Sequence, residues 1–129
     1  MKGIVRQNLS AERLTDEGCF ILQSWGLPAD GSLSLARARV EVGQRTRWHR
    51  LHGVREIYLI TEGSGLVELG GEAPRRVGVG DLVHIPPELP QRIAQEGRDD
   101  LVFYCICTPA FTQACYEDME GAGAEKDKA

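Results

Sequence analysis

Two short blocks of the sequence carry the side chains best suited to chemistry. In the first block, His49 and His52 are three residues apart and Glu56 follows four residues later. The second block begins at Gly80, contains two consecutive prolines and ends at Gln91. Imidazole and carboxylate groups together suit proton transfer or the binding of a transition metal. We therefore interpret the two blocks as two halves of one site.

Short strands separated by glycine and proline are expected to position these blocks. The chain contains 15 glycines, most of them between apolar runs, and no sustained helical period appears before about residue 110. This spacing is typical of a β-sandwich or a closed β-barrel. The predicted strands cover residues 4–9, 19–25, 32–42, 46–52, 56–62, 66–69, 77–79, 81–85, 91–95 and 101–107.

The length of the chain, 129 residues, suits one domain with a single core. Within that domain we expect N-terminal strands at residues 1–31 and a barrel at residues 32–109. A short helix is predicted at residues 110–120. The tail at residues 121–129 is low in apolar residues and is expected to be disordered.

Charge and hydropathy argue against two classes of partner. The formal net charge is −4, with most of the excess acid near the C-terminus, so no basic face for nucleic acid is expected. No apolar run reaches the roughly 18 residues that a membrane span needs. The first residues lack the pattern of a secretory signal, and the four cysteines contain no Cys-x-x-Cys pair. We expect a cytoplasmic protein with reduced cysteines.

The run at residues 32–42 alternates between small apolar side chains and charged ones. Its charged positions are Arg37, Arg39 and Glu41. Because successive side chains of a strand point to opposite faces, the pattern predicts a half-buried strand with a solvated outer face.

The order of these residues resembles that of the cupin superfamily, whose members are jelly-roll barrels. The first cupin motif is Gly, five residues, His-x-His, three or four residues, Glu, six residues and Gly. This frame is met by Gly43, His49, Glu56 and Gly63. The second motif begins with Gly, five residues and Pro, as at Gly80 and Pro86. The resemblance implies an all-β, cupin-type double-stranded β-helix (jelly-roll) barrel, followed here by the short C-terminal helix and the disordered tail.

Two of the four usual ligand positions depart from the cupin pattern. The second histidine of the first motif falls on Leu51, and the histidine of the second motif falls on Gln91. If a bulge turned His52 inward, then His49, His52, Glu56 and Gln91 could hold one divalent ion of Fe, Mn, Ni, Cu or Zn. The alternative is a pocket that has lost its metal, in which Leu51 forms an apolar wall at a ligand position and His49 bonds to Glu56 or Gln91. Both alternatives remain open at this point.

Two further residues are candidates for contact with a ligand. Arg47 shares the parity of His49, so it is expected at the barrel mouth, where it could pair with a carboxylate or phosphate of the ligand. The alternative is a rim arginine paired with a surface acid. Tyr58 shares the parity of Glu56 and is expected either to line the cavity or to pack in the core. No catalytic residue is assigned, although Glu56 or His49 could act as a base without a metal.

Three classes of function follow from these features. The first is a small-molecule-binding cupin, with or without a divalent metal in the barrel. The second is a metal-dependent oxygenase, isomerase or lyase acting on a small polar or acidic metabolite. The third is a non-catalytic structural or regulatory module. The resemblance also implies a homodimer, in agreement with surplus apolar residues at Leu33, Leu35 and the N-terminal run.

Overall fold

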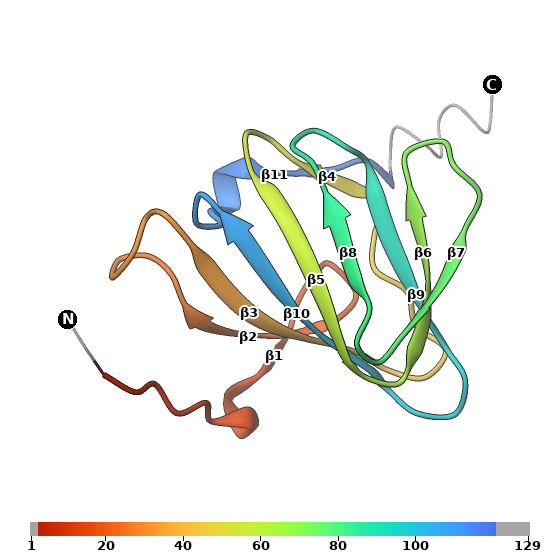
Figure 1. Ribbon diagram of the computed structural model, residues 1–129, viewed down its shortest axis with the longest axis horizontal. Helices are drawn as coiled ribbons and strands as arrows, with labels where there is room; N and C mark the ends of the chain where they lie inside the picture. Colours follow the sequence, from red (N-terminus) through yellow and green to blue (C-terminus); the bar gives the residue numbers. More distant parts are fainter. Residues whose placement is uncertain (1–2, 121–129) are drawn as a thin grey trace.

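Two antiparallel β-sheets pack face to face in the computed structural model of the protein, which describes residues 3–120 (Figure 1). The tail expected to be disordered, residues 121–129, lies outside the described residues. One sheet has six strands in the order β1-β2-β3-β10-β5-β8, and the other has five in the order β11-β4-β9-β6-β7. This arrangement confirms the predicted jelly-roll barrel.

The strands follow the predicted runs closely from residue 20 to residue 108. Their bounds are β1 Arg13–Leu14, β2 Phe20–Trp25, β3 Ser34–Val40, β4 His49–Leu51, β5 Arg55–Glu62, β6 Ser64–Leu69, β7 Arg75–Gly78, β8 Leu82–Ile85, β9 Gln91–Glu96, β10 Leu101–Thr108 and β11 Tyr116–Asp118. Two 3-10 turns, η1 (Leu9–Ala11) and η2 (Gln113–Cys115), complete the described elements. None of the helical segments among residues 3–120 is long and apolar enough to cross a membrane.

The core lies between the sheets because every second side chain of each strand points inward. Val40, Ile60, Ile93, Leu101 and Phe103 are at most 1% exposed and belong to one apolar core cluster. The chain passes from β5 to β6, and so from one sheet to the other, through a single glycine, Gly63, at φ +73°. A Cβ there would collide with the carbonyl oxygen of Asp100. This steric requirement explains the glycine that ends the first motif.

The N-terminal segment differs from the prediction. Residues 4–9 form no strand, and the first strand is the short β1. The segment instead lies over the outer face of the six-stranded sheet, where the Gln7 amide donates to the Tyr104 hydroxyl at 2.7 Å. Its apolar side chains Ile4 and Val5 remain 76% and 56% exposed. An apolar run indicates a strand only if a free sheet edge lies beside it, and this run crosses a face.

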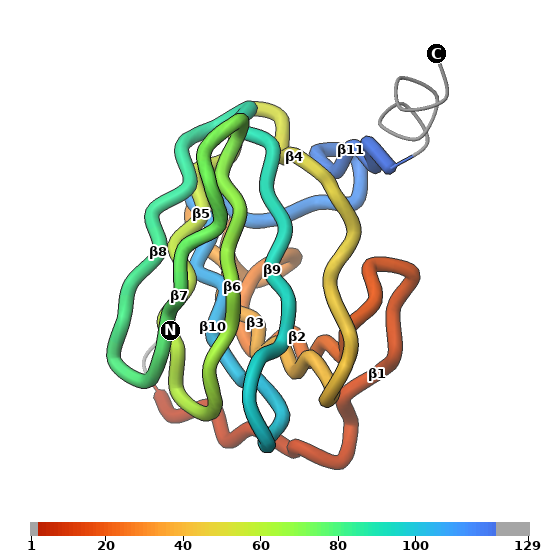
Figure 2. Tube along the Cα trace, turned by 90° about the vertical axis from the view of Figure 1, so that its right-hand side faces the viewer, coloured from red at the N-terminus to blue at the C-terminus, as the bar shows by residue number. Residues whose placement is uncertain are grey.

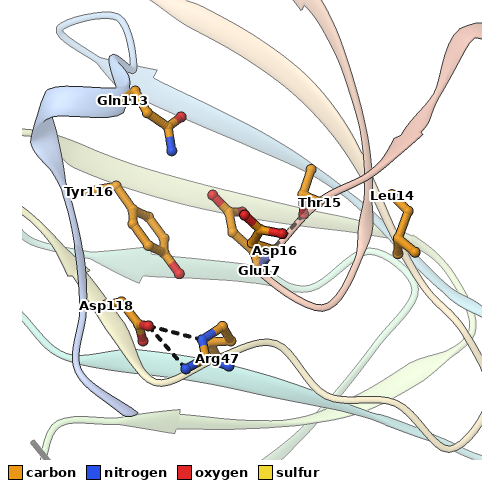
Figure 3. Close-up of a pocket in the computed structure, with 8 residues that line it drawn as sticks. All are labelled: Leu14, Thr15, Asp16, Glu17, Arg47, Gln113, Tyr116 and Asp118. Carbon is orange, nitrogen blue, oxygen red and sulfur yellow. Dashed lines mark hydrogen bonds and ion pairs between the residues drawn. The ribbon is translucent and has the colours of Figure 1, made fainter. Parts of the chain in front are cut away.

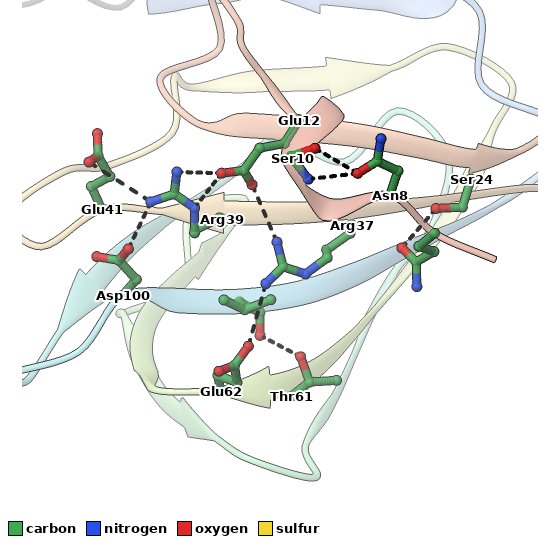
Figure 4. Close-up of polar contacts among 12 residues, drawn as sticks. Asn8, Ser10, Glu12, Ser24, Arg37, Arg39, Glu41, Thr61, Glu62 and Asp100 are labelled. Atoms are coloured by element: carbon green, nitrogen blue, oxygen red, sulfur yellow. Dashed lines mark hydrogen bonds and ion pairs between the residues drawn. The ribbon is translucent and has the colours of Figure 1, made fainter.

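The outer face of β3 is also less solvated than predicted. Glu12 accepts hydrogen bonds from both arginines of β3, at 3.3 Å from Arg37 Nη1 and 2.9 Å from Arg39 Nε (Figure 4). Arg39 also donates to Asp100 at 2.8 Å and lies 4.2 Å above the ring of Phe20. The arginine side chains are only 12% and 22% exposed. The segment that carries Glu12 therefore covers a face that we expected to be open to water.

The helical segment predicted at residues 110–120 is shorter in the structure than expected. The described chain forms the single turn η2, whose start is capped by the Thr112 hydroxyl accepting from the Cys115 amide at 3.3 Å. It then forms β11, which pairs with β4 in the register Tyr116 to Leu51. Pairing is favoured because β4 otherwise presents unpaired backbone groups at the edge of its sheet.

Candidate functional site

Three of the predicted site residues meet inside the barrel. His49 on β4 and Gln91 on β9 are register partners in the five-stranded sheet. Glu56 faces them from β5 in the other sheet, and its Oε1 accepts a hydrogen bond from Gln91 Nε2 at 2.8 Å. All three side chains are buried, with exposed fractions of 6%, 0% and 6% for His49, Gln91 and Glu56.

The Gln91 carboxamide links the two sheets. Its nitrogen donates to Glu56, and its oxygen accepts a hydrogen bond from the Tyr58 hydroxyl. The second oxygen of Glu56 lies 3.6 Å from the thiol of Cys107, which donates to it. The nitrogen and the oxygen of the Gln91 carboxamide therefore each have a hydrogen-bond partner on β5, as a fully buried amide requires.

The buried carboxyl group has an altered proton affinity. Burial raises the pKa of Glu56 to about 7, and the nearby charge of Glu17 adds to this effect, whereas the hydrogen bond from Gln91 opposes it. A buried carboxylate is costly because the low-dielectric surroundings disfavour its charge. Near neutral pH the group can therefore exist in either protonation state.

His49 is held in one tautomer. Its Nδ1 lies 2.6 Å from the carbonyl oxygen of Arg47, and a carbonyl can only accept, so Nδ1 carries the proton. Its ring stacks on the ring of Tyr116 at 5.0 Å between centroids. Burial lowers the pKa of His49, which favours the neutral imidazole with an Nε2 lone pair.

His52 does not join the other three residues. It lies outside the barrel at the β4–β5 turn, with its side chain 45% exposed. Its two ring nitrogens contact Glu88 Oε2 at 2.5 Å and Glu117 Oε1 at 2.6 Å. These two carboxylates raise the pKa of His52. No bulge turns the ring inward, so strand parity decides its direction.

The two predicted ligand contacts lie at different depths. Arg47 is at the rim, where its Nε and Nη2 contact Asp118 Oδ2 at 3.2 and 3.0 Å. Tyr58 is 3% exposed, and its hydroxyl donates a hydrogen bond to the carboxamide oxygen of Gln91. His84, on the outward-facing side of β8, is exposed and does not contribute to the cluster.

The donor set of the cluster does not fit a divalent metal. Across residues 3–120, no three His, Cys, Asp or Glu side chains are grouped so that they could hold one. His49 is the single imidazole of the cluster, Leu51 occupies the second histidine position of the motif, and the Gln91 oxygen faces the hydroxyl of Tyr58. Transition metals in proteins are usually bound by several imidazole, thiolate or carboxylate groups.

Three adjoining hollows lead from the surface to this cluster. The outer hollow, of about 490 Å³, is bordered by Arg47, Asp118 and Tyr116 (Figure 3). A middle hollow of about 230 Å³ has largely apolar walls. An inner hollow of about 40 Å³ reaches His49, Glu56 and Tyr58. Glu17 borders all three, and we call the three hollows together the entrance.

Glu17 and Tyr116 belong to the site although the motifs do not contain them. Glu17 lies in the turn between β1 and β2, beside the chain that leads into β4 (Figure 2), where its carbonyl accepts from the Arg47 amide at 3.0 Å. The turn needs Gly18 at φ +90°, because a Cβ there would lie 2.6 Å from the Arg45 carbonyl oxygen. The one sequence signal for this turn was that glycine.

The fold and the buried cluster place the protein in a known class. The chain belongs to the cupin family, because the model of the cupin domain matches residues 36–107, more than half of its length. A curated relative, uncharacterized protein MJ1618 of Methanocaldococcus jannaschii, is 39% identical over 87 residues. The match covers 67% of this chain and 66% of that protein, so the chain spans just under two thirds of the relative's length.

Solved structures share the fold at low sequence identity. An uncharacterized double-stranded β-helix protein from Klebsiella pneumoniae superposes with a TM-score of 0.75 at 11% identity, covering 91% of this chain and 97% of that one. Streptomyces Pac13, described as a nucleoside dehydratase, superposes with a TM-score of 0.74 at 17% identity, covering 93% and 92%. At these identities the likeness shows the fold alone.

Proposed function

We propose that the protein binds a small organic molecule in the hollows at the open end of its barrel, and that it does so without a metal. The observation that carries this proposal is the group of three adjoining hollows, two of which are lined by the buried carboxyl of Glu56. Barrel mouths of this shape, with apolar walls and a few converging polar groups, are common ligand sites. The donor set around His49 supports the metal-free part of the proposal.

The test uses untagged protein purified under non-denaturing conditions. Native mass spectrometry should show a bound small molecule, and elemental analysis should find less than stoichiometric Fe, Mn, Ni, Cu or Zn. In an Ala36→Phe variant the new ring would fill the middle hollow, which Ala36 borders, so the bound mass should disappear. Ala29→Phe, at an exposed position, is the matched control and should keep it.

Two results would overturn the proposal. A stoichiometric metal that is lost in His49→Ala would favour the metal-dependent oxygenase, isomerase or lyase instead. Protein that carries neither metal nor ligand, and that is unaffected by Ala36→Phe in a screen against uridine and other common metabolites, would favour a non-catalytic module.

A metal-free enzyme is the second candidate function. The observation that favours it is the pKa of Glu56, which burial raises to about 7, near the pH at which a general acid or base works best. Pac13 supplies a first reaction to try, the dehydration of a nucleoside. Loss of water from an added nucleoside, abolished by Glu56→Gln while binding persists, would support this candidate. Binding without turnover would exclude it.

We also propose that the protein is a homodimer in the cytoplasm. Exposed apolar side chains at Ile4, Val5 and Leu82, 76%, 56% and 67% exposed, support association through the outer face of the six-stranded sheet. The four cysteines are all free, which supports a reducing compartment. Sedimentation at micromolar concentration tests the first point, since Leu82→Glu should shift a dimer toward the monomer whereas Leu27→Glu should not.

A further inference from the structure

The entrance combines unpaired hydrogen-bond acceptors with apolar walls. Resting on the proposed function, we propose that its ligand is an organic cation, a small amine whose ammonium group lies against Glu17 and Tyr116. The apolar body of the ligand would fill the middle hollow. The inference names the class of ligand and assigns Glu17 as the residue that selects it.

Glu17 is a partly desolvated acid without a partner in the described chain. It borders all three hollows, yet no side chain or backbone group among residues 3–120 donates a hydrogen bond to its carboxylate. Burial raises the pKa of Glu17, and no donor counteracts this effect. The Glu17 carboxylate therefore lies beside the hollows without a donor from the described chain and can accept hydrogen bonds from a ligand.

Tyr116 supplies a second unpaired group at the same place. Its hydroxyl oxygen is buried and, within the described residues, has no hydrogen-bond partner. Tyr116 borders the outer and inner hollows, and in Figure 3 its side chain and that of Glu17 face the same space. Burial raises the pKa of Tyr116, and the nearby charge of Glu17 adds to this effect. An ammonium group has three donors and could satisfy both oxygens.

The charges around the entrance exclude an anionic ligand. Asp16, Glu17, Asp118 and Glu56 border the hollows, and among the described lining residues the basic groups are Arg47 and His49. Burial lowers the pKa of His49, which favours its uncharged form. Both of the Arg47 contacts are made with Asp118, so its charge is already compensated. A carboxylate or phosphate ligand would therefore meet uncompensated negative charge, in contrast to the ligand we expected from Arg47 in the sequence.

The walls fit the remainder of such a ligand. Ile21, Ala36, Cys105 and Phe111 border the middle hollow, and Phe111 and Tyr116 present aromatic rings to the inner one. An aromatic face attracts an organic cation through its quadrupole. The volume of about 230 Å³ is close to the lower end for ligand pockets, roughly 300 Å³, so the ligand is a small metabolite.

Three probes of matched shape and different charge test the proposal. Benzylammonium, benzyl alcohol and benzoate are titrated into the full-length protein at pH 7.5, with binding followed by calorimetry and NMR. Benzylammonium should bind roughly tenfold or more tightly than the alcohol, the usual gain from a hydrogen bond to a charged group, and benzoate should not bind. Glu17→Gln should remove that advantage. Glu72→Gln, which removes one charge from the exposed β6–β7 turn, should not.

A second measurement checks the position of Glu17 without any ligand. Because the charge of Glu17 contributes to the raised pKa of Glu56, Glu17→Gln should lower the pKa of Glu56 and Glu72→Gln should leave it unchanged. Side-chain carboxyl NMR measures the pKa of Glu56 in both variants. An unchanged Glu56 pKa in a folded Glu17→Gln variant would show that the two acids do not share the entrance, and the proposal would be withdrawn.

The outcomes separate this inference from the proposed function. If the alcohol or benzoate binds as tightly as benzylammonium, or if Glu17→Gln keeps full affinity for the cation, the inference is overturned. Loss of that binding in Ala36→Phe would then still uphold a ligand pocket. If none of the three probes binds the wild-type protein at millimolar concentration, the inference is overturned, and the mass spectrometry described above decides the proposed function separately.

Discussion

Replacing Glu56 with glutamine should make the protein more stable at alkaline pH. Burial raises the pKa of this carboxyl from 4.5 to about 7, so between these values the folded protein holds a proton that the unfolded chain releases. A folded-state pKa above the unfolded one gives a stabilising contribution that is complete below the unfolded pKa and is lost as the pH rises through the folded one. At about 1.36 kcal/mol for each pKa unit, the loss reaches about 3 kcal/mol by pH 8.

Glutamine is the appropriate replacement because it keeps the shape of the side chain. Its oxygen can accept the hydrogen bond from Gln91, and its nitrogen can face the sulfur of Cys107. The variant lacks only the ionisable proton, so its free energy of unfolding should not decline between pH 5 and pH 8 on account of this position. Relative to wild type, the variant should gain about 2–3 kcal/mol over that range.

Urea unfolding at pH 5, 6, 7 and 8 measures this difference. Glu72→Gln, at an exposed position, is the control, and its unfolding free energy should follow that of the wild type at every pH. A Glu56→Gln variant that is less stable than wild type at pH 8 would refute the reasoning. So would a difference between the two proteins that is the same at pH 5 and pH 8, since the carboxyl would then not carry a raised pKa.

Three further substitutions test other parts of the structure. Gln91→Leu should lower the free energy of unfolding by about 2–5 kcal/mol, because it leaves two buried polar groups unpaired; a loss below about 1 kcal/mol in urea would contradict this. Gly18→Ala should cost about 1–3 kcal/mol in the same assay, owing to its positive φ and the contact with the Arg45 carbonyl, and an unchanged midpoint would show that the turn can relax. His52→Ala should lower the melting temperature more at pH 6 than at pH 9. The reason is that two carboxylates raise the pKa of the imidazole, so its stabilising contribution is present below the unfolded pKa and is lost as pH rises through the folded one; an equal loss at both pH values would count against the ion pairs.

The central part of the fold could be predicted because its local signals agree with one another. Glycine spacing and strand alternation indicated a β-sandwich or a closed barrel. The resemblance of the two motifs to those of cupins implied a jelly roll, and the family match confirms it. The structure of the two ends of the chain was harder to predict. Residues 4–9 are apolar enough for a strand, but they lie exposed across a face of the sheet. Residues 116–118 join an edge that is visible only once the sheet exists. Pairing partners at the ends of a chain depend on the finished barrel.

The site was predicted in part for the same reason. His49, Glu56 and Gln91 lie on strands inside the motifs, so the resemblance to the cupin motifs was enough to predict that they meet. Glu17 and Tyr116 come from a turn and a terminal strand that the barrel positions from outside the motifs. The separation of His52 from His49 follows from strand parity alone. The contact between Arg47 and Asp118 depends on strand β11, which was not predicted from the sequence.

The cross-sheet amide of Gln91 has a consequence for how the barrel tolerates acid and base. A carboxamide neither gains nor loses a proton in the physiological range, and its nitrogen can donate to a carboxyl oxygen in either ionisation state. The hydrogen bonds between the two sheets at this point are therefore maintained by a group that does not titrate. Glu56 can exchange its proton with a bound ligand or with water while strands β5 and β9 stay in place.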